Sequence, residues 1–278
     1  MRTVRLPDGR EVPAIGQGTW KIGEGRRSRG EEEAAIRLGI DLGLTLIDTA
    51  EMYGEGRSEE VVGRAIAGRR DAVFLVTKVY PHNASRAGIP KACARSLKRL
   101  GVDRIDLYLL HWPGSVPVAE TIDAFEALRE RGKIGAWGVS NFDVSGMEEV
   151  VGIAGGAGCA TDQVLYNPEA RGIEFDLLPW ARQRRMPLMA YSPLGQAGEL
   201  LRSRALAEVA QRHGATPAQV AIAWSIRSAA VISIPKAGDA AHVRENAAAA
   251  DLTLTADDLA LIDATHKPPR RKEPLEML

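Results

Sequence analysis

The 278-residue sequence predicts an α/β fold, a (β/α)8 TIM barrel with an N-terminal β-hairpin and two additional helices. Eight short, continuously apolar runs alternate with eight longer segments of helical pattern. Continuously apolar strands are typical of a parallel sheet buried on both faces, and eightfold strand–helix alternation favours a closed barrel over an open sheet. No composition shift, internal repeat or low-complexity tract divides the chain. We therefore expect one barrel domain over residues 1–278.

The expected elements follow in a regular order along the chain. Asp8-Gly9 lies between two short runs, so residues 4–16 are expected to form a hairpin in front of the first barrel strand. The eight expected strands are residues 14–20, 44–50, 73–79, 105–111, 134–140, 160–167, 187–193 and 231–237. The eight expected helices are residues 31–42, 58–67, 90–100, 119–131, 144–153, 176–184, 204–213 and 240–249.

Two further helical patterns lie outside this alternation, at residues 216–228 and 255–266. They begin at Thr216 and Thr255, whose hydroxyls are suitable N-caps because they can accept a bond from an unpaired backbone N–H of the first turn. Ser58 is expected to cap its helix in the same way, although a full capping box is missing there.

The charge balance narrows the class of protein. Lysine plus arginine and aspartate plus glutamate both number 36, so the formal net charge is zero and nothing favours nucleic acid as a partner. Two cysteines, Cys93 and Cys159, are too few for a disulfide framework, and the first ten residues lack the apolar core of a signal peptide. No apolar stretch is long enough to cross a membrane. We expect a cytoplasmic protein, and a monomer.

Polar and ionisable residues gather at the ends of the expected strands, where barrels of this kind hold their chemistry. Taken singly, an aspartate there is usually a turn former, a lysine is usually solvated, and a histidine is more often structural than catalytic. A site is favoured by the convergence of four titratable residues from three consecutive strand–loop units. The strand-end residues are Asp48, Tyr53, Lys78, His111, Ser140, Asn141, Gln163, Tyr166, Asn167, Tyr191, Ser192, Pro193 and Lys236.

The chemistry of these four titratable residues is complementary. A free tyrosine has a pKa near 10, and a neighbouring ammonium lowers that pKa. Lys78 can supply the ammonium, Asp48 can hold the lysine in place, and His111 can hydrogen-bond a substrate oxygen. Tyr53 is then a general acid tuned toward the operating pH. No activated nucleophile and no cluster with zinc spacing accompanies it, so we expect no metal and infer a hydride-carrying nicotinamide as the reaction partner.

Seven motifs carry a family resemblance, in chain order: IDTAEMYGEGRSEEVVG, FLVTKV, IDLYLLHWP, WGVSNF, DQVLYNP, AYSPLG and IPKAGDAAHVREN. They resemble the successive motifs of the aldo-keto reductases, and are similar to those of the small bacterial-type members that act on short aldehydes. The match covers essentially the whole chain. The resemblance implies a (β/α)8 barrel that reduces carbonyl groups with NADPH, without metal or flavin. The family's catalytic tetrad falls here on Asp48, Tyr53, Lys78 and His111.

The resemblance also implies a mechanism and a set of cofactor contacts. Hydride passes from the nicotinamide to the carbonyl carbon, and Tyr53 donates the proton. Lys78 and Asp48 tune that tyrosine, and His111 steers the substrate oxygen. The implied cofactor contacts are Gly18, Thr19, Trp20, Asp48, Ser192, Pro193, Leu194 and Gly195 along the dinucleotide, Ser140, Asn141 and Gln163 on the carboxamide, and Tyr191 on the nicotinamide ring.

The phosphate-binding end departs from the family pattern. In the family a lysine followed by a serine, and an arginine six residues after that lysine, hold the adenosine 2′-phosphate. Here Lys236 is followed by Ala237, and His242 stands at the arginine position. Arg244 comes two residues later, on a different face of the helix. Losing an always-charged arginine weakens phosphate selectivity, so we expect a preference for NADPH with some use of NADH. The adenine-contacting pair is matched by Glu245 and Asn246.

Aromatic residues just past the strand ends predict an apolar substrate pocket, formed by Trp20, Tyr53, Tyr80, His111 and Trp112. The residues after the last helical pattern are too few for the long C-terminal loop that shapes steroid-sized pockets in larger relatives. We therefore expect a small-molecule carbonyl substrate, a small aldehyde or an α-ketoaldehyde such as methylglyoxal. The alternative is a nicotinamide-binding regulatory subunit with little catalysis, since a fold alone does not decide function.

Overall fold

The computed structural model describes all 278 residues and contains a parallel eight-stranded barrel, as the sequence predicts. The strands pair in chain order, each with the next. They are β3 (Gln17–Gly18), β4 (Leu46–Asp48), β5 (Phe74–Val79), β6 (Ile105–Leu110), β7 (Ile134–Ser140), β8 (Cys159–Leu165), β9 (Leu188–Tyr191) and β10 (Val231–Ser233).

The barrel closes between its first and last strands. Single parallel bridges join Ile15 to Ser233 and Gly18 to Lys236, so β3 and β10 meet along a short seam. A Cβ added at Gly18 would lie 2.6 Å from the Ile234 carbonyl oxygen, so only glycine lets the two segments approach this closely here. The first strand is shorter than predicted because only Gln17 and Gly18 pair in a ladder with β4, and its pairing on the other side consists of isolated bridges.

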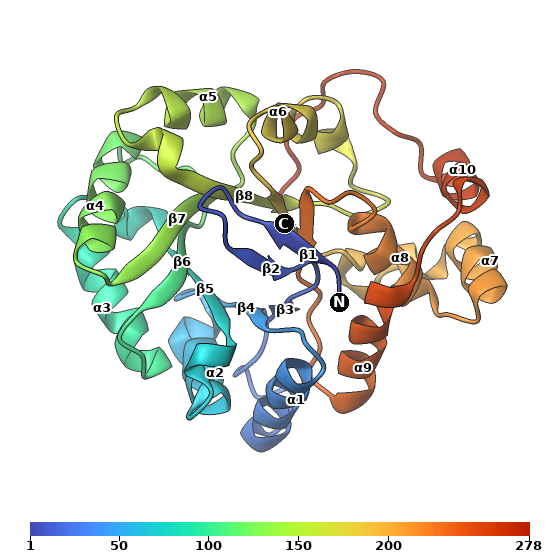
Figure 1. Cartoon of the computed structure of the whole chain (residues 1–278), viewed down its shortest axis with the longest axis horizontal. Helices are drawn as coiled ribbons and strands as arrows, with labels where there is room; N and C mark the ends of the chain where they lie inside the picture. The colour runs from blue at the N-terminus through green and yellow to red at the C-terminus, as the bar shows by residue number, and fades with distance from the viewer.

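Helices surround the barrel on all sides (Figure 1). The eight that follow the strands are α1 (Arg29–Asp41), α2 (Arg57–Ile66), α3 (Gly88–Leu100), α4 (Val118–Glu130), α5 (Val144–Gly152), α6 (Leu177–Gln183), α7 (Arg204–His213) and α9 (Ala240–Ala248). The two additional helices are α8 (Pro217–Ser225) and α10 (Ala256–Thr265). Thr216 and Thr255 form capping boxes with Gln219 and Asp258, which confirms their predicted role as N-caps.

The prediction for Ser58 is wrong. Gly56 is the N-cap of α2, and no side chain bonds the first turn there. Ser58 lies inside that turn and is fully buried. Its hydroxyl instead hydrogen-bonds Thr19 and Thr49 at the mouth of the barrel.

The N-terminal hairpin closes one end of the barrel. It consists of β1 (Thr3–Arg5) and β2 (Glu11–Pro13), paired antiparallel, and crosses the barrel centre nearest the viewer in Figure 1. Val4, Leu6 and Val12 pack in one cluster with the residues that fill the barrel interior. The hairpin therefore seals the end where the strands begin and leaves the other end as the mouth.

The core has two layers, as alternation along buried strands requires. One cluster of 21 buried residues includes the side chains inside the barrel, such as Leu107 and Leu109 of β6. The other, of 49 buried residues, lies between strands and helices and includes Tyr108 and Leu110 of the same strand. Cys93 and Cys159 are both buried and unpaired. None of the helices is long and apolar enough to cross a lipid bilayer.

Candidate active site

Strand alternation brings the predicted tetrad to the mouth of the barrel. Side chains two residues apart on a strand face the same side. On β4, β5 and at the end of β6, an interior apolar residue is followed two positions later by an ionisable one, in the pairs Leu46 and Asp48, Val76 and Lys78, and Leu109 and His111. The strands thus carry an aspartate, a lysine and a histidine to the same end of the interior.

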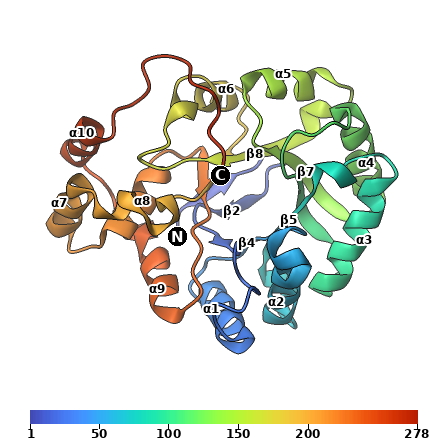
Figure 2. The same cartoon turned by 180° about the vertical axis from the view of Figure 1, so that it is seen from behind.

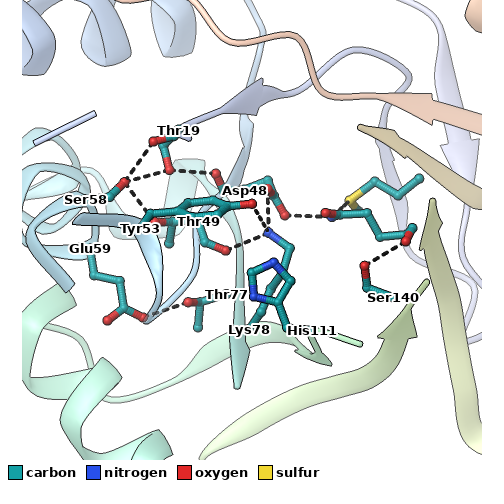
Figure 3. Close-up of polar contacts among 12 residues, drawn as sticks. Thr19, Asp48, Thr49, Tyr53, Ser58, Glu59, Thr77, Lys78, His111 and Ser140 are labelled. Carbon is teal, nitrogen blue, oxygen red and sulfur yellow. Dashed lines mark hydrogen bonds and ion pairs between the residues drawn. The ribbon is translucent and has the colours of Figure 1, made fainter. Parts of the chain in front are cut away.

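Lys78 is the centre of this cluster (Figure 3). Its ammonium nitrogen lies 2.7 Å from Asp48 Oδ2, 2.9 Å from the Thr49 carbonyl oxygen and 3.2 Å from the Tyr53 hydroxyl oxygen. Gln163 Nε2 donates to the other oxygen of Asp48 at 2.8 Å. The side chains of Lys78 and Asp48 are 0% and 2% exposed, so this is a desolvated ion pair with nearly every donor and acceptor engaged.

A buried chain of hydroxyls fixes the loop that carries Tyr53. Ser58 donates to Thr19, and Thr19 Oγ1 donates to the Asp48 carbonyl oxygen at 2.9 Å. Thr49 donates to Ser58 at 3.1 Å. These bonds tie the ends of β3 and β4 to the first turn of α2, and the loop between them makes a tight left-handed turn at Gly54, Glu55 and Gly56. Ser58 therefore positions the loop from its far end.

The Tyr53 hydroxyl is arranged as a proton donor. Lys78 donates to the Tyr53 oxygen, so the tyrosine's own hydrogen is free for another acceptor. Burial raises the pKa of Tyr53 above its usual 10.0; Lys78 lowers it and Asp48 raises it, with burial dominant. The expectation that Lys78 brings this pKa down toward neutrality is therefore wrong, because burial, with a smaller contribution from Asp48, outweighs the effect of the ammonium. Tyr53 stays protonated at neutral pH.

Lys78 stays charged in this buried position. Burial lowers the pKa of Lys78, but the adjoining Asp48 carboxylate and Tyr53 oxygen outweigh burial, and the net shift is upward. A fixed cation next to the phenol would stabilise the phenolate that forms when the proton leaves. Lys78 thus contributes by stabilising the Tyr53 phenolate once the proton has left, and it does not bring the pKa of the free tyrosine below its ordinary value.

His111 is a neutral hydrogen-bonding group. Burial and the charge of Lys78 lower the pKa of His111 to about 2. Its Nδ1 atom is buried without a hydrogen-bond partner, and its ring meets the Tyr53 ring edge-on with centroids 5.8 Å apart. A neutral imidazole can orient a substrate oxygen but has no proton to spare as an acid, which leaves Tyr53 as the acid of the cluster.

Aromatic side chains extend from His111 along the rim. The Trp112 ring lies 4.7 Å from the His111 ring, and the Tyr80 ring stands perpendicular to Trp112 at 5.7 Å. Trp20 lies on the loop after β3, and the Lys21 ammonium is 3.9 Å from the centre of its ring. Four of the predicted substrate residues thus form a continuous row of aromatic rings, in the order Tyr53, His111, Trp112 and Tyr80. The contact between the Trp20 ring and the Lys21 ammonium was not predicted.

The predicted carboxamide contacts form one network beside Asp48. Ser140 donates to the Gln163 carbonyl oxygen at 2.7 Å, and Asn141 donates to the His111 carbonyl oxygen at 3.1 Å. The Tyr191 hydroxyl donates to Asn141 Oδ1 at 3.0 Å. Burial raises the pKa of Tyr191 to about 12. Asn141 has a left-handed backbone, with φ of 63°, that turns its side chain back over the end of β7.

The loop after Tyr191 is unusually contorted. Ser192, Gly195, Gln196 and Ala197 all have positive φ, between 47° and 58°. Three of these are not glycine, and such conformations cost of order 1–3 kcal/mol each. Strain of this kind is stored at ligand-binding loops, which agrees with the predicted contact of Ser192 to Gly195 with the dinucleotide.

The predicted adenosine end lies at the start of α9. Lys236 and Ala237 follow β10, and Asp239 is the N-cap of the helix. His242 Nδ1 lies 2.8 Å from Asp239 Oδ2. Glu245 accepts a hydrogen bond from Thr216, the N-cap residue of α8. Asn246 is buried, and Arg244 is exposed.

Two features of this face are absent from the predicted site. Arg27, on the loop after β3, pairs with Asp239 at 2.8 Å. The segment after α10 runs past α6 to the middle of the barrel (Figures 1 and 2). Lys272 lies 3.6 Å from Asp176, and the backbone of Leu278 lies near enough to the Tyr191 hydroxyl to lower its pKa against the dominant effect of burial. The C-terminal segment thus reaches the mouth although it is short. Neither this segment's contacts nor the Arg27–Asp239 pair has a local sequence signal, because each contact joins residues far apart in the chain.

A separate cavity lies away from this site. It measures about 660 Å³ and lies on the outer surface between α2 and α3. Its basic lining includes Arg64, Arg70 and Lys98, near the C-terminal ends of the two helices. Cations are favourable at helix C-termini, which accounts for this lining without a ligand.

The mouth residues fit a nicotinamide dinucleotide. Ser140 and Asn141 place a buried hydroxyl and a largely buried amide beside the tetrad, Tyr191 offers an aromatic face, and Gly238 leaves a cradle at the far end. A Cβ added at Gly238 would lie 3.1 Å from the Lys236 ammonium nitrogen. A redox-inactive set of a phenol, an ammonium, a carboxylate and a neutral imidazole also requires an external hydride source for any reduction.

Comparisons with known proteins agree with this geometry. The chain matches the model of the aldo/keto reductase family over residues 14–267. It is 51% identical over 271 residues to methylglyoxal reductase YeaE of Escherichia coli (strain K12), across 96% of this chain and 95% of that protein. It is 35% identical over 271 residues to glyoxal reductase of Bacillus subtilis (strain 168), across 96% and 94%. A crystal structure of an aldo-keto reductase from Klebsiella pneumoniae in complex with NADPH has a TM-score of 0.98 and 50% identity, over 100% of this chain and 99% of that one.

Proposed function

Since this chain belongs to the aldo/keto reductase family, we propose that it reduces small aldehydes and α-ketoaldehydes, such as methylglyoxal, to alcohols with NADPH. The observation that carries the proposal is the Tyr53 hydroxyl, which accepts from Lys78 and keeps its own hydrogen for a substrate. The relatives named for methylglyoxal and glyoxal reduction support the substrate class.

The cofactor supplies the hydride when bound, and the chain supplies the rest. Tyr53 gives its proton to the substrate oxygen, and Lys78 stabilises the phenolate that remains. His111 orients that oxygen through a neutral N–H. Asp48 holds Lys78 in place and is itself held by Gln163. Ser140, Asn141 and Tyr191 would hold the nicotinamide end, and Lys236 the phosphate end.

The aromatic row from Tyr53 to Tyr80 supports a compact, largely apolar binding surface. The segment that ends near Tyr191 narrows the mouth further and favours short carbonyl compounds over bulky ones. No feature of the site favours a regulatory nicotinamide-binding subunit. A cytoplasmic location and a monomeric state stay predictions.

A panel of carbonyl compounds assayed with NADPH and with NADH tests the proposal. We expect the highest kcat/KM for short aldehydes and α-ketoaldehydes, and a higher kcat/KM with NADPH than with NADH. Turnover of bulky ketones without turnover of any short aldehyde would contradict the substrate class. A clear preference for NADH would contradict the cofactor.

A further inference from the structure

A single carboxylate joins two segments at the adenosine end. Asp239 Oδ2 lies 2.8 Å from Arg27 Nη2 and 2.8 Å from His242 Nδ1. Arg27 comes from the loop between β3 and α1, and is 212 positions away from Asp239 in the chain. Asp239, the N-cap of α9, thus holds Arg27, which is distant in the sequence, beside Lys236.

Arg27 and Lys236 converge over Gly238. A Cβ added at Gly238 would lie 3.1 Å from the Lys236 ammonium nitrogen and 3.4 Å from Arg27 Cδ. Burial lowers the pKa of Lys236, Glu32 and Asp239 oppose this, and the positive charges of Arg27 and Arg26 lower it further. The net direction is downward with burial as the largest cause, and a bound phosphate beside Lys236 would favour its charged form.

The guanidinium of Arg27 is only partly used. Its one hydrogen bond is from Nη2 to Asp239, and the side chain is 42% exposed. The remaining N–H groups are free to donate, and a guanidinium can bind a phosphate through two parallel bonds. A lysine alone offers a point charge without this geometry.

We propose that Arg27 is a specificity-determining residue that binds, together with Lys236, the 2′-phosphate by which NADPH differs from NADH. Asp239 holds Arg27 over Gly238 before the cofactor arrives. The arginine missing at the position of His242 is thus replaced in space from a different loop. This inference rests on the proposed NADPH-dependent function and names the residue that sets its cofactor preference.

The competing explanation is a purely structural bridge between the loop after β3 and α9. Arg27→Gln and Asp239→Asn separate the two, because asparagine still caps a helix but carries no charge. In a structural bridge, both variants weaken NADP⁺ and NAD⁺ binding together. In a phosphate site, Arg27→Gln weakens NADP⁺ alone, and Asp239→Asn, which loses the ion pair that holds Arg27, weakens NADP⁺ to a smaller extent and leaves NAD⁺ unchanged.

The dissociation constants of NADP⁺ and NAD⁺ are measured by calorimetry on the full chain, without reliance on turnover. We expect Arg27→Gln to raise the dissociation constant for NADP⁺ about tenfold and leave that for NAD⁺ within about twofold. Arg5→Gln is the matched control, because Arg5 is also an exposed arginine in one ion pair, with Glu11 on the hairpin. It should change neither constant.

Equal effects of Arg27→Gln on both cofactors, or no effect on either, would overturn the inference. Equal weakening of NADP⁺ and NAD⁺ binding by Asp239→Asn would overturn it as well. The outcome is separable from that of the proposed function. Selective NADP⁺ binding in a protein that reduces no carbonyl compound would refute only the function, and NADPH-dependent turnover unaffected by Arg27→Gln would refute only the role of Arg27.

Discussion

The Lys78 ammonium donates to the Tyr53 hydroxyl oxygen across 3.2 Å, between residues that are 25 positions apart in the chain. This direction of donation decides what the tyrosine can do. Its oxygen is occupied by a cation and its hydrogen is unassigned, which is the arrangement of an acid ready to donate.

Tyr53→Phe removes the transferable proton but keeps the ring and its packing on His111. We expect kcat for aldehyde reduction to fall by about 10²–10⁴-fold, the usual contribution of a positioned general acid. The dissociation constant for NADP⁺ should stay unchanged, since the removed hydroxyl bonds only Lys78. Steady-state kinetics and calorimetry measure the two quantities. A variant with near-normal turnover would show that another group supplies the proton.

Lys78→Met leaves Asp48 buried without its cation. We expect the free energy of unfolding to fall by about 3–5 kcal/mol, as for other buried ion pairs that lose one partner. Urea unfolding measures this change. Adding Asp48→Asn to the same variant should restore part of the loss, because the unpaired charge is then gone. Lys91→Met, at an exposed lysine of α3, is the control and should have a small effect. Full additivity of the two single changes would argue against a coupled pair.

The pH profile of carbonyl reduction should be flat through the neutral range. Burial raises the pKa of Tyr53 above 10.0, so the acid form persists and activity falls only as the pH rises through that value. The pKa of His111 is lowered to about 2, so this histidine adds no inflection near its ordinary value of 6.5. Measuring kcat/KM from about pH 6 to about pH 11 checks both statements. An inflection near pH 6.5 that disappears in His111→Gln would contradict the assignment of a neutral ring.

Asp258 should stabilise the fold by an amount that is lost in acid. Burial opposes its ionisation, but hydrogen bonds from His213, Thr255 and Arg212 outweigh burial and hold the pKa of Asp258 well below 3.8. Because the pKa of Asp258 is lower in the folded than in the unfolded state, its ionised form stabilises the fold at any pH above the unfolded-state pKa. This stability is lost as the pH falls toward the folded-state pKa. Asp258→Asn should therefore lower the free energy of unfolding by about 1–3 kcal/mol at neutral pH. The gap between the variant and the parent should narrow below pH 3.8; a constant gap would contradict the prediction.

The tetrad was accessible from sequence because its positions follow from local rules. Asp48, Lys78 and His111 each end a short apolar run, and the period of two along a strand turns all three inward. Parallel pairing in chain order then places them side by side. The hairpin and the threonine caps of α8 and α10 are likewise read from a few neighbouring residues.

The features that sequence reasoning missed depend on contacts across the chain. The local sequence pattern predicts that the Ser58 hydroxyl caps a helix. In the structure this hydroxyl instead hydrogen-bonds Thr19, 39 residues earlier. The pKa of Tyr53 depends on how completely the fold excludes water, which no spacing of residues reports. The pairing of Arg27 with Asp239 requires the barrel to be closed before the two loops meet.

The seam between β3 and β10 has a consequence for biosynthesis. Gly18 is synthesised early and Lys236 late. The first strand can therefore pair with the last strand only after most of the polypeptide has left the ribosome. Its open edge is a temporary template for wrong pairing in nascent chains. Ribosome-bound chains that stop short of Ser233 should therefore be protease-sensitive and hold no dinucleotide, and maturation should begin only after release of the last strand.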